Sequence, residues 1–162
     1  MSAGGWRLPA LLLALPLLGG CAVSTGFKGP GYDRSAGVTA PGEGPVVVAL
    51  TRATLHPGGT GRSRFRAGTA DILDALPDQP GVVGWSVRRT LEGSTAWTMT
   101  VWQDEASLKA FLRSPAHRSA VTASLDAVST AVFARIPVER NRIPLSWEEA
   151  LAILEREGYS YQ

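Results

Sequence analysis

Residues 96–105 read Ala96-Trp97-Thr98-Met99-Thr100-Val101-Trp102-Gln103-Asp104-Glu105. The first seven alternate in character, which is typical of a β-strand with two unlike faces. One face carries Trp97, Met99 and Val101, and the other carries Thr98, Thr100 and Trp102. Asp104 is a good N-cap, so a helix is expected to begin directly after the strand. This stretch therefore predicts a strand followed by a helix, with the strand separating two different layers.

Strands and helices alternate on both sides of this unit. Glu92-Gly93-Ser94 predicts a hairpin between the second and third strands. The order βαββαβ over residues 45–138 predicts an α+β, ferredoxin-like domain with both helices on one face of an antiparallel sheet. Periodicity and turn residues predict strands over 46–55, 82–89, 96–102 and 128–137, and helices over 66–76 and 104–113. Ser114-Pro115 predicts a new helical segment directly after the second helix, ending near residue 125.

A C-terminal extension, residues 139–162, follows this domain. Ser146 and Glu149 form a capping-box pattern, and Ala150 and Leu154 lie on one helical face behind it. These residues predict a short amphipathic helix. The sequence leaves open whether this helix packs on its own domain or on a partner subunit.

The first 20 residues have the pattern of a bacterial signal peptide. Arg7 precedes an apolar run of about 11 residues, whereas a membrane-spanning helix needs about 20. Leu18-Gly19-Gly20-Cys21 resembles the lipobox of bacterial lipoproteins, and Cys21 is the only cysteine in the chain. The pattern predicts lipidation of Cys21 and a membrane-anchored protein on the extracytoplasmic side of the cell envelope. An ordinary secretory signal beside an incidental cysteine is the alternative.

Residues 21–44 are rich in Gly, Pro, Ser and Thr, and they predict a flexible tether between the anchor and the domain. The formal net charge is +2, and the arginines are scattered along the chain. This pattern predicts neither a nucleic-acid partner nor a polybasic membrane patch. Acyl chains on Cys21 would hold the protein to a lipid bilayer without such a patch.

Residues 96–105, together with Leu108, Phe111, Ser114-Pro115 and His117-Arg118, resemble the third-strand to second-helix region of the antibiotic-biosynthesis-monooxygenase-like domains. The resemblance covers residues 45–137. It implies a dimeric α/β barrel in which a second copy covers the exposed face of the sheet, so a homodimer is expected. It also implies a cavity that binds a small apolar or aromatic ligand.

Two residues are the candidates for catalysis, His117 and Trp102. His117 lies near the start of a helix, where the helix dipole keeps an imidazole neutral. The candidate ligand-binding residues are Trp85, Trp97, Arg113 and Arg118. No metal site and no cofactor motif is predicted, so an oxygenase reaction would take its electrons from the substrate. The alternatives are that these side chains serve packing, and that the domain is a non-enzymatic binding or oligomerisation module.

The resemblance also implies haem as a possible ligand. The haem-degrading members pair a histidine at the start of the second helix with a strand tryptophan and an asparagine in the first strand. Here His117 and either Trp97 or Trp102 fit that pattern, whereas the only asparagine of the chain is Asn141, beyond the fourth strand. The residues therefore favour haem binding over haem degradation.

Overall fold

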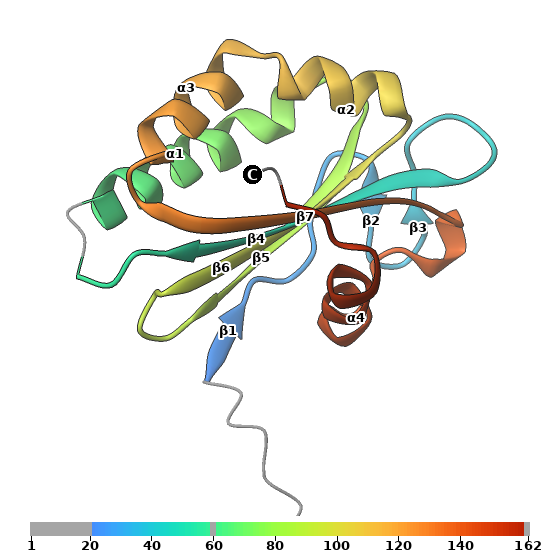
Figure 1. Cartoon of the computed structure of the whole chain (residues 1–162). Coiled ribbons are helices and arrows are strands. Elements are labelled where there is room, and N and C mark those ends of the chain that lie inside the picture. Colours follow the sequence, from blue (N-terminus) through green and yellow to red (C-terminus); the bar gives the residue numbers. More distant parts are fainter. Residues whose placement is uncertain (1–20, 59–60, 161–162) are drawn as a thin grey trace, which may run out of the picture.

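The computed structural model describes residues 21–58 and 61–160, so the predicted signal peptide lies outside the described residues. Its centre is an antiparallel sheet with the strand order β1-β5-β6-β4-β7 (Figure 1). The four long strands confirm the predicted strands to within one residue at each end, and the α+β, ferredoxin-like fold is confirmed. The strands of this sheet are β1 (Ala22–Ser24), β4 (Val46–Leu55), β5 (Val82–Thr90), β6 (Thr95–Trp102) and β7 (Val128–Val138).

Three helices cover one face of the sheet, and the predicted break between the second and third is confirmed (Figure 1). The Asp104 carboxylate accepts a hydrogen bond from the backbone N–H of Ser107 at 2.7 Å. The Ser114 hydroxyl accepts one from the backbone N–H of His117 at 3.2 Å, which starts the third helix. The helices are α1 (Gly61–Ala75), extended by the 3₁₀ turn η1 (Leu76–Asp78), α2 (Glu105–Leu112) and α3 (Pro115–Ser124). In the described part of the chain, no helix combines the length and the apolarity needed to cross a membrane.

Helix α1 begins five residues before the predicted start at residue 66. Its first half carries arginines instead of an apolar repeat, so periodicity does not reveal it. Close packing holds this helix instead, because Gly68 is buried and a Cβ added to it would lie only 3.3 Å from Ala120 of α3. A larger residue at position 68 would separate the two helices.

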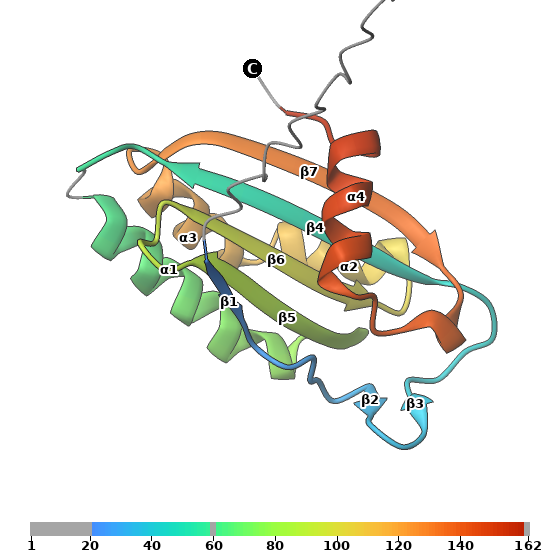
Figure 2. The same ribbon diagram turned by 90° about the horizontal axis from the view of Figure 1, so that it is seen from below.

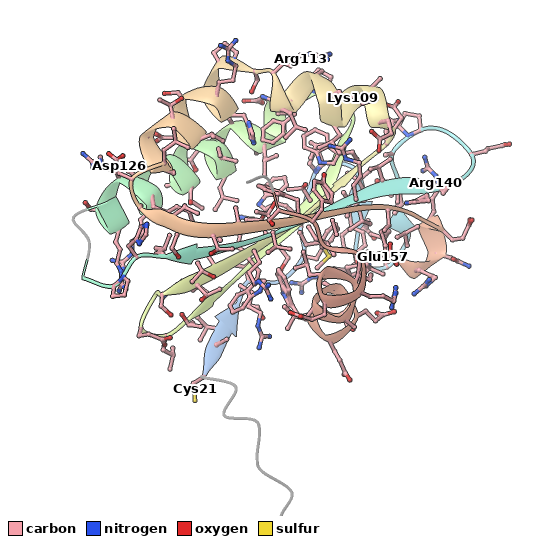
Figure 3. All side chains as sticks on the ribbon, viewed as in Figure 1. Cys21, Lys109, Arg113, Asp126, Arg140 and Glu157 are labelled. Atoms are coloured by element: carbon pink, nitrogen blue, oxygen red, sulfur yellow. The ribbon has the colours of Figure 1, made fainter. Side chains whose placement is uncertain are left out.

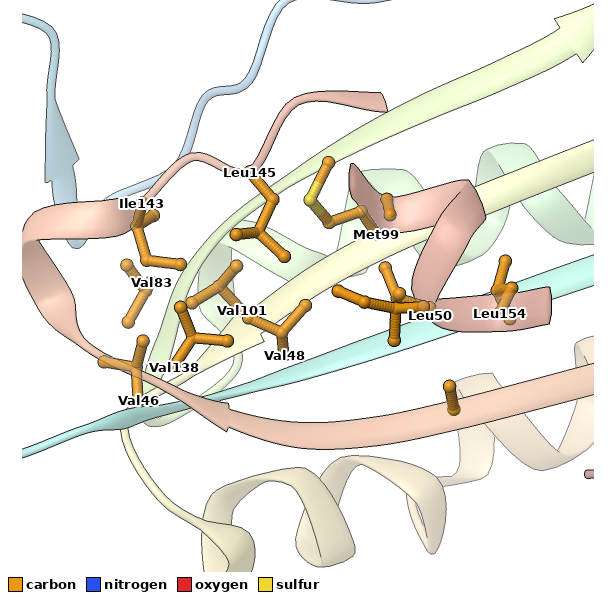
Figure 4. Packing of buried hydrophobic residues seen from close by; sticks show 13 residues of the cluster. Val46, Val48, Leu50, Val83, Met99, Val101, Val138, Ile143, Leu145 and Leu154 are labelled. Atoms are coloured by element: carbon orange, nitrogen blue, oxygen red, sulfur yellow. The ribbon is translucent and has the colours of Figure 1, made fainter. Parts of the chain in front are cut away.

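The other face of the sheet is covered by α4 (Trp147–Glu157), which lies across it (Figure 2). The predicted capping box between Ser146 and Glu149 is confirmed. The helix therefore packs on its own domain, after a short connection that contains the 3₁₀ turn η2 (Arg140–Arg142). It buries Ala150, Ile153 and Leu154 in a cluster with Val46, Val48, Leu50, Met99 and Val101 of the sheet (Figure 4).

The predicted flexible tether over residues 21–44 is corrected by the structure. This segment forms β1 on the free edge of β5, and a small hairpin of β2 (Tyr32–Asp33) and β3 (Gly37–Val38). Between them, Lys28 pairs with Trp85 of β5. Backbone hydrogen bonds to a strand edge need no apolar-rich sequence, which is why composition alone is misleading here. The apolar residues of the segment that pack against the core are Phe27, Tyr32, Val38 and Ala40.

Replacing Gly29 by alanine is expected to loosen this segment, because a Cβ at that position would overlap the backbone of Gly84 in β5. We expect the free energy of unfolding, measured by urea denaturation, to fall by about 1–3 kcal/mol, the usual cost of overpacking. Gly26→Ala is the matched control, since the atom nearest to its added Cβ is 3.6 Å away. Equal stability of the two variants would mean that the segment is not held against β5.

Candidate functional site

Small side chains line the middle of the sheet face that α1, α2 and α3 cover. Ala49 lies opposite Thr100, and Thr51 lies opposite Thr98, on the neighbouring strands β4 and β6. We call these four residues the central strip. All four remain partly exposed, whereas Leu50, on the opposite face of the same sheet, is buried. Solvent therefore reaches the sheet beneath the helices, and we take the central strip as the candidate ligand-contact surface.

An aromatic stack stands at one end of the central strip. The fully buried ring of Trp102 stacks on Phe111 of α2, with ring centroids 4.9 Å apart. Phe111 in turn contacts the ring of His117 edge-on, at 5.0 Å. The indole N–H of Trp102 donates to the Thr100 hydroxyl at 2.9 Å, which ties the stack to the central strip. The structure thus brings the two candidate catalytic residues into one cluster, with Phe111 between them.

His117 is half-buried, on the face of α3 that also carries the buried Ala120. Burial lowers the pKa of the His117 imidazole below its ordinary value of 6.5, and the backbone carbonyl of Leu112 opposes this shift by accepting a hydrogen bond. The positive end of the α3 dipole also disfavours the imidazolium. The ring is therefore neutral at pH 7, the state in which it can accept a proton.

A charged pair that the sequence analysis did not select lies on the same side of the sheet. Arg135 of β7 lies opposite Ala49 in the register, so its side chain leaves the sheet on the central-strip face. Its guanidinium contacts the Glu105 carboxylate in the first turn of α2 at 3.1 Å, and both side chains are partly exposed. The alternation of residues in β7 is enough to assign Arg135 to this face. The pairing with Glu105 leaves no pattern in the sequence, because the two residues are 30 positions apart.

The sequence of this core matches a known family. Residues 46–123 match the family model described as antibiotic biosynthesis monooxygenase. Residues 46–123 are therefore an antibiotic-biosynthesis-monooxygenase-like domain. The match spans β4 to α3 and so includes the central strip and the aromatic stack.

Individual proteins agree with this assignment. The chain is 34% identical over 119 residues to spheroidene monooxygenase from Rubrivivax gelatinosus, and the aligned part is 73% of this chain but only 43% of that protein. SnoaB, a cofactor-independent oxygenase from Streptomyces nogalater, superposes with a TM-score of 0.51 at 20% identity, over 62% of this chain and 98% of SnoaB. A conserved protein from Methanosarcina mazei gives 0.51 at 14% identity, over 57% and 91%. At these identities, the two structures show the shared fold alone.

The tryptophans of the monooxygenase domain do not share one cavity. Trp85 belongs to the same buried cluster as Trp102, and the Lys28 ammonium lies 5.8 Å from the centroid of its ring. Trp97 lies on the α4 face, between Arg52 and Arg88 of the neighbouring strands, and its indole N–H is buried without a hydrogen-bond partner. Because the sheet separates Trp97 from Trp102, a single pocket lined by all three rings is excluded.

The remaining candidates lie on the outer surface. Arg113, at the end of α2, and Arg118, in α3, are both exposed, so their predicted role in ligand binding stays a prediction. The domain has a shallow depression of about 240 Å³ between α1 and α3, and another of about 260 Å³ between β7 and α4, and neither is lined by His117 or Trp102. Within residues 21–58 and 61–160, no three His, Cys, Asp or Glu side chains are grouped as a metal site would require.

The lowered pKa of His117 can be measured by NMR titration. The chain has two histidines, and the His56→Gln variant leaves a single imidazole signal to follow. We expect the folded protein to titrate below 6.5, because burial disfavours the charged ring. The unfolded chain then binds the proton more tightly, so the free energy of unfolding falls as pH drops below about 6.5, and His117→Gln removes this fall. A measured pKa at or above 6.5 would contradict the burial argument.

Proposed function

We propose that the domain oxygenates a small apolar or aromatic substrate without a bound cofactor, in the space beside the central strip, with His117 as the base. The observation that carries the proposal is a neutral, half-buried imidazole at the end of an aromatic stack, on the sheet face that solvent can reach. The related spheroidene monooxygenase is itself named as a monooxygenase, which supports the reaction class. The related fold of SnoaB, a cofactor-independent oxygenase, is compatible with a reaction without a cofactor.

The proposed reaction needs a base and a substrate that supplies electrons. His117 removes a proton from an activated CH₂ group, and the resulting carbanion passes its electrons to O₂. One oxygen atom enters the product as a carbonyl and the other leaves as water, so CH₂ plus O₂ becomes C=O plus H₂O. No external reductant takes part.

The other residues of the site position these groups. Trp102 is fully buried, so we assign it a positioning role: its ring supports Phe111, which contacts His117. The Arg135–Glu105 pair joins β7 to α2, so it fixes the distance between the sheet and the helix that carries Phe111.

Anthrone, a flat tricyclic ketone with an acidic CH₂ group, is a suitable probe for this activity. We expect the protein to accelerate its conversion to anthraquinone, with one oxygen atom taken from ¹⁸O₂. His117→Gln is expected to lower the turnover rate by about 10²-fold or more, as is usual when a general base is lost. His56→Gln is the matched control, because His56 is an exposed loop residue. Equal rates for the wild type and His117→Gln would refute the role of His117.

Two further outcomes separate the alternatives. Quenching of tryptophan fluorescence by anthrone without oxygen uptake would favour a non-enzymatic binding module. Haemin tests the other ligand that the sequence suggests: a shift of the Soret band that is lost in His117→Ala would favour haem binding through the imidazole, and no shift would remove that option.

We further propose that Cys21 is acylated and anchors the domain to a membrane on the extracytoplasmic side. In support, the Cys21 thiol is exposed, and the chain has no second cysteine with which it could pair. Mass spectrometry of the protein from bacterial membranes is expected to show acyl groups on residue 21, and Cys21→Ser is expected to leave the membrane fraction. An unmodified Cys21 in the mature protein would contradict the anchor and leave the oxygenase proposal untouched.

A further inference from the structure

One end of the sheet presents apolar side chains beside Cys21. Strand β1 is antiparallel to β5, which places Cys21 next to the tip of the β5–β6 hairpin (Figure 3). The backbone carbonyl of Cys21 accepts a hydrogen bond from the N–H of Leu91, the first residue after β5, at 3.0 Å. Leu91 is 58% exposed, and Val23 of β1 is 44% exposed. We call this part of the surface the hairpin end.

Positive charge gathers at the same end although the arginines are far apart in the sequence. Arg66 of α1 approaches the hairpin turn, because a Cβ built on Gly93 would lie 3.0 Å from its guanidinium. Arg62 donates to the backbone carbonyl of Glu92 at 3.4 Å. Arg89 lies opposite Val23 in the register and is exposed. The acidic residues at this end are Glu92, at the tip of the hairpin, and Asp126, whose carboxylate lies 3.5 Å from the Arg64 guanidinium.

Helix stability does not explain these charges. Arg62, Arg64 and Arg66 occupy the first half of α1, and the first turn of α1 has no acidic residue. The N-terminus of a helix carries partial positive charge, so basic side chains there are unfavourable, typically by a few tenths of a kcal/mol each. The acidic residues of this helix, Asp71 and Asp74, lie in its second half. The arrangement is the reverse of the one that stabilises a helix.

We infer that the hairpin end is a membrane-contact surface that rests on an anionic phospholipid bilayer. Leu91 and Val23 enter the interfacial region, and the exposed Arg66 and Arg89 face the lipid phosphates. A basic patch beside an acyl anchor adds attraction to anionic lipids, and so it holds this end of the domain against the membrane. The inference rests on the proposed acylation of Cys21, which supplies the anchor at this point of the fold.

The position of Cys21 fixes how the domain would stand on the membrane. Its carbonyl is hydrogen-bonded into the sheet, so no loose linker separates the acyl chains from the domain. Strand β4 extends over 10 residues, about 33 Å, from Leu55 near the hairpin end to Val46, and Glu43 lies in the loop that precedes Val46. The strands therefore point away from the bilayer, and Glu43 lies at the end of the domain remote from it.

Nitroxide labels at two positions test this orientation in the acylated full-length product. Acylation occupies the Cys21 thiol, so a label attaches only to an engineered cysteine, Leu91→Cys or the control Glu43→Cys. The protein is reconstituted in phosphatidylcholine vesicles with or without phosphatidylglycerol, and label accessibility to oxygen and to a water-soluble nickel chelate is measured by electron paramagnetic resonance. We expect the oxygen-to-nickel accessibility ratio at position 91 to be several-fold higher than at position 43 on the anionic vesicles.

Reversing the charge of two basic residues at a time is the second part of the test. Arg66→Glu with Arg89→Glu is expected to abolish the difference between the two labels, whereas Lys109→Glu with Arg142→Glu, at the far end of the domain, makes the same change in net charge and is expected to preserve it. Water-like accessibility at both labels on anionic vesicles would overturn the inference. So would equal effects of the two charge reversals. Mass spectrometry of the same samples reports acylation, so a missing anchor is distinguished from an anchored domain that does not lie on the membrane.

Discussion

Both faces of the antiparallel sheet carry large apolar side chains, and the need to bury these side chains is the constraint on which the rest of the structure depends. On one face Val48, Leu50 and Met99 are at most 1% exposed, and on the other Trp102 is fully buried. Each such side chain contributes about 1.5–3 kcal/mol when it is removed from water. Residues of α1, η1 and α2 pack in one cluster with Trp102, while α4 and residues 27–40 cover the opposite face. A single chain therefore supplies both layers.

The residues that meet this constraint also create the candidate site. Helix α2 ends at Leu112 and Ser114 caps a new helix, and this change of direction turns the ring of His117 towards Phe111. A continuous helix would place residue 117 at a different angle, because each residue adds about 100° around the axis. The small residues of the central strip stay partly exposed on the same face of the sheet. The candidate site therefore combines a packed aromatic cluster at one end with a partly exposed strip beside it.

The sequence predicts the features that depend on residues close together in the chain. The alternation of residues 96–102 assigned Trp97 and Trp102 to opposite faces, and the caps at Asp104, Ser114 and Ser146 set the helix starts. His117 was found because it follows one of these caps by three residues.

The sequence does not predict the features that depend on contacts between distant parts of the chain. Residues 21–44 are held by the free edge of β5 and by the approach of Gly29 to Gly84, neither of which leaves a periodic pattern in the sequence. The Arg135–Glu105 pair and the arginines at the hairpin end likewise join parts of the chain that are well separated in sequence.

Helix α4 changes what the predicted homodimer can look like. The expectation was that a second copy covers the sheet face opposite α1, α2 and α3. In this chain Ala150, Ile153 and Leu154 of α4 already occupy that face and are at most 7% exposed. A second copy could pack there only by displacing α4, which would return those side chains to water at a cost of several kcal/mol. The homodimer stays a prediction. Because α4 already buries this face, a dimer contact through another surface is favoured. All residues around the central strip then come from one chain.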